Sequence, residues 1–120
     1  MLYNKYEYVT TQSAARRVIL AARAAKECAL DFETTSLAPA DGRVRTVNLC
    51  CPEARAVIDF DQVGGFARYA KLFEEGAWVV FNSKFEGRWF QAHAVTPTLL
   101  DVGHIRRSVM GGGRFSLATM

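Results

Sequence analysis

The chain has 120 residues, half of them apolar, and a formal net charge of +3. This length and composition suit one small domain with a buried core and are not those of a disordered chain. No apolar run reaches the length of a membrane span, and the first residues do not form a secretory signal. We therefore expect a single domain over residues 1–120 that does not enter a membrane.

The three cysteines are Cys28, Cys50 and Cys51, and their spacing is not typical of a zinc site. Cys50 and Cys51 are neighbours on an expected strand, so their side chains should point to opposite faces. We expect all three to be reduced thiols that serve as small apolar residues. This favours a cytoplasmic protein, whether its gene belongs to a chromosome, a phage or a plasmid.

The first half of the chain predicts a strand, a helix and three more strands. The stretch YEYVTT is β-prone, and residues 12–26 carry apolar side chains at helical spacing. The stretches CALDFET, VRTVNLCC and ARAVIDF are β-rich and are separated by short breaks. Strands joined so closely indicate an antiparallel three-stranded start to the sheet.

The second half predicts helices that flank one buried strand. GGFARYAKLFEEG reads as a helix that ends at Gly76, and AWVVFN as a strand covered on both faces. SKFEGRWFQAHA reads as a helix with Ser83 as its N-cap, and residues 96–110 as a short strand and a helix. SLATM looks like the first turn of another helix, and Trp78 and Trp89 are expected in the core. The fold class is therefore α/β, with a mixed sheet flanked by helices.

Two carboxylates, Asp31 and Glu33, lie near the end of the expected strand CALDFET. Residues i and i+2 face the same side of a strand, so these side chains project together and repel each other. A hard divalent cation such as Mg²⁺ or Mn²⁺ would neutralise the pair. Spacing alone leaves open a pair that is merely solvated.

The string LDFETTSL resembles the first motif of the DEDD (DnaQ-like) superfamily of 3′–5′ exonucleases, in which Gly usually stands where this chain has Ser36. VVFNSKFEGRWF is similar to the second motif, with Glu86 where the family has Asp. LLDVGHIRRSV and RFSLATM resemble the segments that follow it in the proofreading domains of A-family DNA polymerases. Ribonuclease D belongs to the same superfamily. The resemblance covers residues 28–120, and the preceding strand and helix also fit.

This resemblance implies an RNase H-like fold, with parallel strands after the antiparallel start, and phosphodiester hydrolysis by two divalent metal ions, Mg²⁺ or Mn²⁺. By resemblance, Asp31 would bridge both metals. Glu33 would bind one metal and approach the terminal 3′-hydroxyl, and Glu86 would hold the other metal. These three acids are the expected catalytic and metal-binding residues.

The resemblance also implies a surface that holds the 3′ end of a single strand. Leu37 would pack near the terminal base, and Asn82 would touch the strand. Lys84 and Arg88 are positioned in the motif to meet phosphates, which adds salt-dependent affinity without sequence preference. The remaining motif positions expected at this surface are Thr34 and Phe85.

The family's third motif carries a Tyr or His and a fourth carboxylate, and no matching pattern follows residue 86. We therefore expect a C-terminally incomplete fold with little activity of its own. One hypothesis is a 3′–5′ exonuclease for DNA or RNA ends that obtains the third motif from a longer chain, another subunit or a polymerase. The alternative is a catalytically crippled module that binds nucleic acid or a partner protein, and self-association also remains open.

Overall fold

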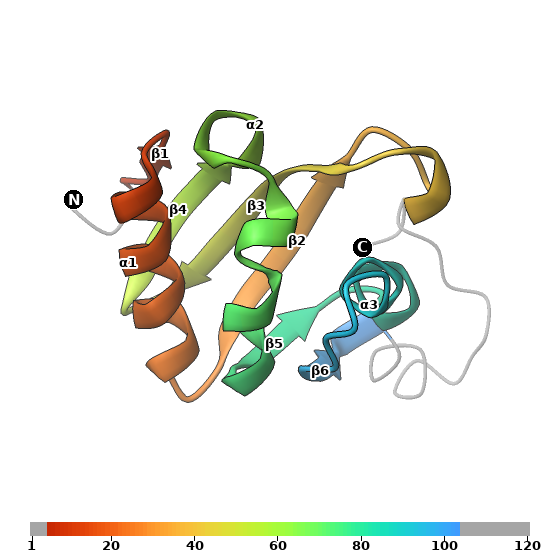
Figure 1. Ribbon diagram of the computed structural model, residues 1–120. Coiled ribbons are helices and arrows are strands. Elements are labelled where there is room, and N and C mark those ends of the chain that lie inside the picture. The colour runs from red at the N-terminus through yellow and green to blue at the C-terminus, as the bar shows by residue number, and fades with distance from the viewer. Residues whose placement is uncertain (1–4, 104–120) are drawn as a thin grey trace.

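A computed structural model describes residues 5–103 of the chain (Figure 1). The strands are β1 (Glu7–Val9), β2 (Cys28–Thr34), β3 (Val44–Cys51), β4 (Ala54–Asp59), β5 (Ala77–Val80) and β6 (Thr98–Asp101). The α-helices are α1 (Gln12–Ala24), α2 (Phe60–Val63) and α3 (Ser83–Gln91). Three short 3₁₀ helices complete the order, η2 (Pro39–Asp41), η3 (Phe66–Arg68) and η4 (Ala70–Glu75).

The strands form one mixed sheet in the order β1-β4-β3-β2-β5-β6. Neighbours β2, β3 and β4 are antiparallel, as the short connections predicted. β1 runs parallel to β4, and β5 and β6 continue the sheet in parallel from β2. The expected mixed α/β sheet with an antiparallel start is therefore confirmed.

The helices lie on one face of this sheet. Figure 1 shows α1, α3 and the helical segment between α2 and β5 on the same side. On β2, Leu30 and Phe32 are buried, whereas Asp31 and Glu33 are exposed. Because side chains alternate along a strand, β2 turns its core residues toward the helices and its carboxylates toward the opposite face.

Aromatic rings fill the space between the sheet and the helices. The ring of Phe32 lies 5.2 Å from that of Phe66 and 5.1 Å from that of Phe90, measured between centroids. Trp78 and Trp89 are 0% and 2% exposed, which confirms that both belong to the core. Aromatic contacts of this kind bury large apolar surfaces and fix the position of α3 above β2.

The segment expected to be one helix ending at Gly76 forms instead η3 and η4, although it does end at Gly76. Gly64 and Gly65, with φ of 104° and 94°, end α2 and turn the chain before this segment. Only residues 66–75 remain between this turn and Gly76. Within them, the hydroxyl of Tyr69 donates a hydrogen bond to the carbonyl of Val63 (2.7 Å). Such short connecting segments commonly adopt the tighter 3₁₀ geometry.

The N-cap of α3 also differs from the prediction. The cap is Asn82, whose Oδ1 accepts a hydrogen bond from the N–H of Lys84 (3.1 Å), and Ser83 is the first helical residue. The hydroxyl and the N–H of Ser83 both donate to Oδ2 of Asp101, at 2.7 and 2.9 Å. The end of β6 therefore fixes the start of α3, and this partner draws Ser83 away from the capping role.

The face of the sheet opposite the helices is less covered than expected. On β5, Trp78 and Val80 are buried but Ala77 and Val79 are only half-buried, so the prediction of cover on both faces is wrong for the described residues. Cys28 and Cys51 are buried, Cys50 is half-buried, and none is in a disulfide. Most of the helix expected in the second part of residues 96–110 lies outside the described residues, and so does the whole turn expected at SLATM. Within residues 5–103 no helix is long and apolar enough to cross a membrane.

Candidate active site

The carboxylates of Asp31 and Glu33 lie together on the open face of the sheet. Across the ladder, Asp31 faces Asn48 and Glu33 faces Thr46, both on β3. Partial burial raises the pKa of Asp31, and the negative charge of Glu33 raises it further. The two acids repel each other as the i, i+2 spacing predicted, and Asp31 is the one driven toward its neutral form.

A β-bulge lies beside this pair. The register passes from Glu33 opposite Thr46 to Thr34 opposite Val44, so Arg45 is the extra residue on β3. A bulge of this kind redirects a side chain and is often found next to active sites. A cavity of about 280 Å³ is lined by Tyr8, Asp31, Glu33, Arg45, Thr46, Asn48 and Val57. The bulge thus brings a cation to the cavity that holds both carboxylates.

Arg45 is held more loosely than its neighbour Arg43. Nε of Arg45 lies 3.8 Å from a carboxylate oxygen of Asp61. Arg43 donates two hydrogen bonds to the same carboxylate, from Nε at 2.8 Å and from one terminal nitrogen at 2.9 Å. Arg43 is therefore held by a bidentate ion pair with Asp61, whereas the looser contact of Arg45 lets its side chain turn toward an anion in the cavity.

Glu86 is a buried acid in the first turn of α3, and only 3% of its surface is exposed. Among residues 5–103 its Oε1 has no hydrogen-bond partner. Burial raises the pKa of Glu86 to about 7, and the charges of Asp31 and Asp101 add to this effect against backbone hydrogen bonds that lower it. Glu86 therefore lies close enough to Asp31 to sense its charge, and it carries an unsatisfied oxygen.

These acids have the oxygen donors that Mg²⁺ and Mn²⁺ prefer. An orphaned buried oxygen on Glu86 and a repelling pair at Asp31 and Glu33 are features that a bound cation would relieve. Among residues 5–103, however, no three His, Cys, Asp or Glu side chains are arranged to hold one metal ion together. The metal-binding and catalytic roles of Asp31, Glu33 and Glu86 stay predictions.

The loop after β2 presents Leu37 to solvent, with 78% of its surface exposed. Thr34 donates a hydrogen bond from Oγ1 to the carbonyl of Ser36 (2.6 Å), which uses the hydroxyl expected to contact nucleic acid. A Cβ on Gly42 would collide with Oγ1 of Thr35, so only glycine allows this close approach. Leu37 is therefore an exposed apolar side chain on a loop that hydrogen bonds and close packing hold in place. A side chain that contacts a nucleic-acid base would have these properties.

The strand-binding residues expected on α3 have different surroundings. One terminal nitrogen of Arg88 donates to the carbonyl of Leu37 (3.4 Å), which links α3 to the loop after β2. Lys84 and Arg88 are exposed, and within residues 5–103 neither forms an ion pair. Phe85 is half-buried, and Asn82 uses its side-chain oxygen as the helix cap. The two cations are thus the most available of the four.

Sequence reasoning missed Arg45, Asn48 and Asp101 as neighbours of the acids. The signal for the first two was the spacing of Val44 and Val47, which are both buried although they are three residues apart. Such a break in the alternation of a strand marks a bulge. The role of Asp101 depends on its contact with the start of α3 and has no local signal.

The family of this chain is decided by comparison with known domains. A family model described as 3′–5′ exonuclease matches residues 6–120. The chain belongs to this family of 3′–5′ exonuclease domains. The resemblance to the DEDD exonucleases drawn from the two motifs is therefore confirmed. No curated protein matches the chain.

Solved exonuclease structures share the fold at low sequence identity. RNase D from Escherichia coli has 18% identity and a TM-score of 0.75, over 97% of this chain and 32% of that one. The Nibbler EXO domain from Aedes aegypti has 16% identity and a TM-score of 0.69, over 93% of this chain and 59% of that one. Trypanosoma brucei RNase D in complex with RNA U12 has 18% identity and a TM-score of 0.66, over 90% of this chain and 41% of that one. The RNase H-like fold is confirmed, and the chain spans 32% to 59% of the length of these structures.

Proposed function

We propose that this 3′–5′ exonuclease-like domain removes nucleotides from the 3′ end of a single-stranded nucleic acid by metal-assisted hydrolysis. The observation that carries the proposal is the position of Asp31 and Glu33. They lie together on the open sheet face, within the influence of the buried Glu86. In a domain of this family, a polar open cavity with repelling carboxylates supports a hydrolytic centre better than a structural role.

In this proposal, Asp31, Glu33 and Glu86 hold Mg²⁺ or Mn²⁺, with water and a substrate phosphate completing the ligand set. Bound divalent ions would polarise the phosphate and lower the pKa of the attacking water. Glu86 is buried and its pKa is about 7, so about half of the molecules carry its proton at pH 7, and this proton must leave before the carboxylate binds a cation. The chain's own acids therefore make metal affinity rise with pH.

The chain's other residues would orient the strand. Leu37 is exposed beside Arg88, so a terminal base can pack on Leu37 while Arg88 meets a nearby phosphate. Arg45 can contact a phosphate in the carboxylate cavity. A solved structure that shares the fold is in complex with RNA U12, which supports a nucleic acid as the ligand.

A second candidate function is a binding module without catalysis. It is favoured by Glu86, which stands where the family has Asp, and by the lack of a three-acid metal group within residues 5–103. A side chain longer by one methylene displaces the carboxylate, and misplacement of about 1 Å can cost on the order of a hundredfold in rate. Such a module would still hold strands, or would act with a polymerase, another subunit or a second copy that supplies the third motif.

The test is to incubate the protein with a 5′-labelled single strand and Mn²⁺. RNA and DNA strands are assayed in parallel, beside Asp31→Asn and a control, Asp41→Asn, which removes an exposed acid of the η2 turn. We expect slow stepwise shortening by the wild type and the control but not by Asp31→Asn. Binding without shortening would favour the binding module. A protein that neither shortens nor binds either strand would contradict both functions.

A further inference from the structure

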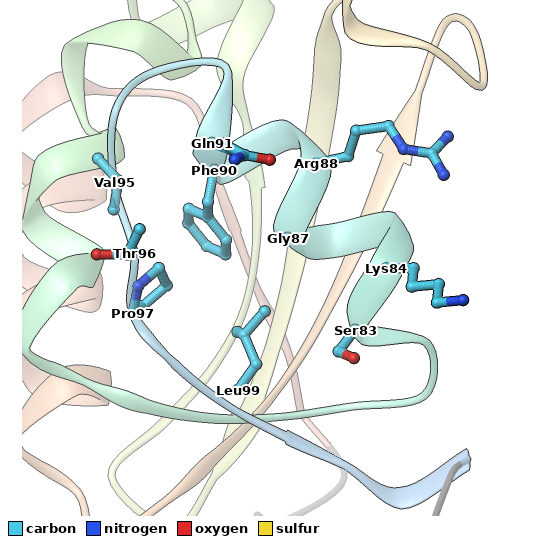
Figure 2. Close-up of a pocket in the computed structure, with 10 residues that line it drawn as sticks. All are labelled: Ser83, Lys84, Gly87, Arg88, Phe90, Gln91, Val95, Thr96, Pro97 and Leu99. Atoms are coloured by element: carbon cyan, nitrogen blue, oxygen red, sulfur yellow. The ribbon is translucent and has the colours of Figure 1, made fainter.

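A second cavity, of about 460 Å³, lies beside α3 and shares no lining residue with the carboxylate cavity. Figure 2 shows it between α3 and the segment that leads into β6. The apolar part of its lining comes from Gly87 and Phe90 on one side and Val95, Pro97 and Leu99 on the other. Its volume and mainly apolar lining are those of a small-molecule site.

Gly87 leaves this cavity open. Glycine is the poorest helix former after proline, yet Gly87 occupies the middle of α3. Within the described part of the chain, a Cβ at this position would meet only Cδ1 of Leu99, at 3.6 Å, which is ordinary contact. Packing therefore does not demand glycine here. What the missing side chain provides is open space at the wall of the cavity.

Two cations stand on the edge of the cavity. Lys84 and Arg88 are four residues apart on α3, and Figure 2 shows both side chains extending from the side of the helix opposite Leu99. Like charges at this spacing destabilise a helix, and the first turn, where Lys84 lies, disfavours a cation, whereas Arg88 lies in the last turn, where a cation is favoured. Neither forms an ion pair within residues 5–103, so both charges are available to an anion outside the cavity.

Arg88 connects the cavity to the candidate active site. It lines the cavity, and its guanidinium also donates to the carbonyl of Leu37. A strand whose terminal base packs on Leu37 would therefore pass Arg88 before it reaches the opening beside Gly87. The cavity lies where a more distant part of the same strand would run.

We propose that this cavity binds a nucleoside upstream of the two 3′-terminal nucleotides, while Lys84 and Arg88 contact the phosphates on either side. The inference rests on the proposed function, because it assumes that the strand ends at the carboxylates. The base lies against Pro97 and Leu99, where apolar surface accepts any base without sequence preference. The ligand chemistry is a single-stranded nucleic acid, and RNA and DNA are separate arms of the test.

The rim can also hydrogen-bond the base. Gln91 and Thr96 line the cavity, both are exposed, and within residues 5–103 their side chains have no hydrogen-bond partner. An amide and a hydroxyl each donate and accept, so they can meet the polar edge of any base. Cations, apolar surface and polar rim together match a nucleotide better than an apolar helix from a partner.

The experiment fills the cavity from Gly87. Wild type, Gly87→Ala and Gly87→Leu are titrated without metal against a labelled dinucleotide and a longer strand of RNA or DNA, by fluorescence anisotropy. Losing one base contact should weaken binding of the longer strand about tenfold for Gly87→Leu, and less for Gly87→Ala. Dinucleotide binding should stay the same, because its two units reach only Leu37 and Arg88. Equal binding of the longer strand by all three proteins would overturn the inference.

A second variant guards against misfolding of Gly87→Leu. Gln91→Glu places a negative charge on the exposed rim and should weaken only the longer strand. If the wild type binds neither ligand, the proposed function fails along with the inference. If the dinucleotide binds but the longer strand gains nothing from its extra units, the inference alone fails. A change of oligomeric state with Gly87→Leu, without a change in strand binding, would show that a second copy occupies the cavity and would also overturn it.

Discussion

The two faces of the sheet use the same strands for different purposes. On the helix-covered face, Phe32 touches the rings of Phe66 and Phe90 and is 4% exposed. On the open face, its neighbours in sequence, Asp31 and Glu33, line a polar cavity with Arg45. Adjacent residues of β2 therefore serve different purposes. Those on the helix-covered face stabilise the fold, and those on the open face form the candidate active site.

This division teaches that the open face can vary in charge without loss of the fold. Repelling acids contribute little to stability, and Asp31 is already driven toward its neutral form. The covered face has no such freedom, because its side chains interlock at the density of a solid. Variants that break one face should leave the other intact, and each prediction below tests this separation.

Phe32→Ala should have the largest effect. Removing a buried aromatic ring from a packed core costs about 3–5 kcal/mol of the free energy of unfolding. The loss is measured by urea denaturation followed by circular dichroism. The matched variant on the open face, Glu33→Ala, should change stability by less than about 1 kcal/mol. Equal losses for the two variants would contradict the separation of the faces.

Glu86 is a buried acid of α3 that senses the charge of Asp31 on the open face, and it should make stability depend on pH. Its pKa is about 7 in the folded protein against an ordinary 4.5, so the folded state binds the proton more tightly. Its contribution to stability is complete below pH 4.5 and is lost as the pH rises through 7. Glu86→Gln keeps a neutral side chain, so its advantage over the wild type should grow with pH, to the order of 3 kcal/mol.

The measurement is urea denaturation between pH 5 and 8 in the presence of a chelator, within the window set by the two pKa values. Glu75→Gln, at an exposed position next to Gly76, is the control and should follow the wild-type curve. Parallel pH curves for the wild type and Glu86→Gln would show that Glu86 is ionised in the folded protein.

Asp31→Asn should separate activity from stability. The variant removes a charge that Glu33 repels, so the free energy of unfolding should stay the same or rise slightly. In the proposed exonuclease, activity should fall by at least about a hundredfold, because the group that positions the reacting phosphate is lost. The checks are strand shortening and denaturation of the same preparations. A variant that loses activity only because it unfolds would contradict this prediction.

The antiparallel pairing of β2, β3 and β4 was predictable because it depends on local patterns. Alternation of apolar residues marks β2, and short breaks leave only antiparallel pairing for β2, β3 and β4. Local pattern could not choose between Asn82 and Ser83 as the cap of α3, since both residue types are good caps. Asp101, which lies 18 residues beyond Ser83, makes the choice through a contact that sequence order does not reveal.

The candidate site was predictable to the same extent. Asp31 and Glu33 share a face by their spacing alone, and Glu86 came from the likeness of its motif to the family. Arg45 was not predictable, because a bulge is a property of two paired strands and depends on their register. The cavity beside Gly87 likewise arises between α3 and the segment that returns to the sheet, and neither stretch shows it alone.

The smallest predicted effect compares Arg45, which lines the carboxylate cavity, with Arg43, which lies just before β3 and does not line that cavity. Arg45→Gln should weaken binding of a single strand several-fold and lower the slope of its salt dependence by about one phosphate contact. Arg43→Gln should change binding little, because Arg43 is already paired with Asp61 through two hydrogen bonds. Anisotropy titrations over a range of salt concentrations measure both slopes. Equal slopes for the two variants would mean that Arg45 acts only as part of the general positive charge, and that the bulge does not deliver it to the strand.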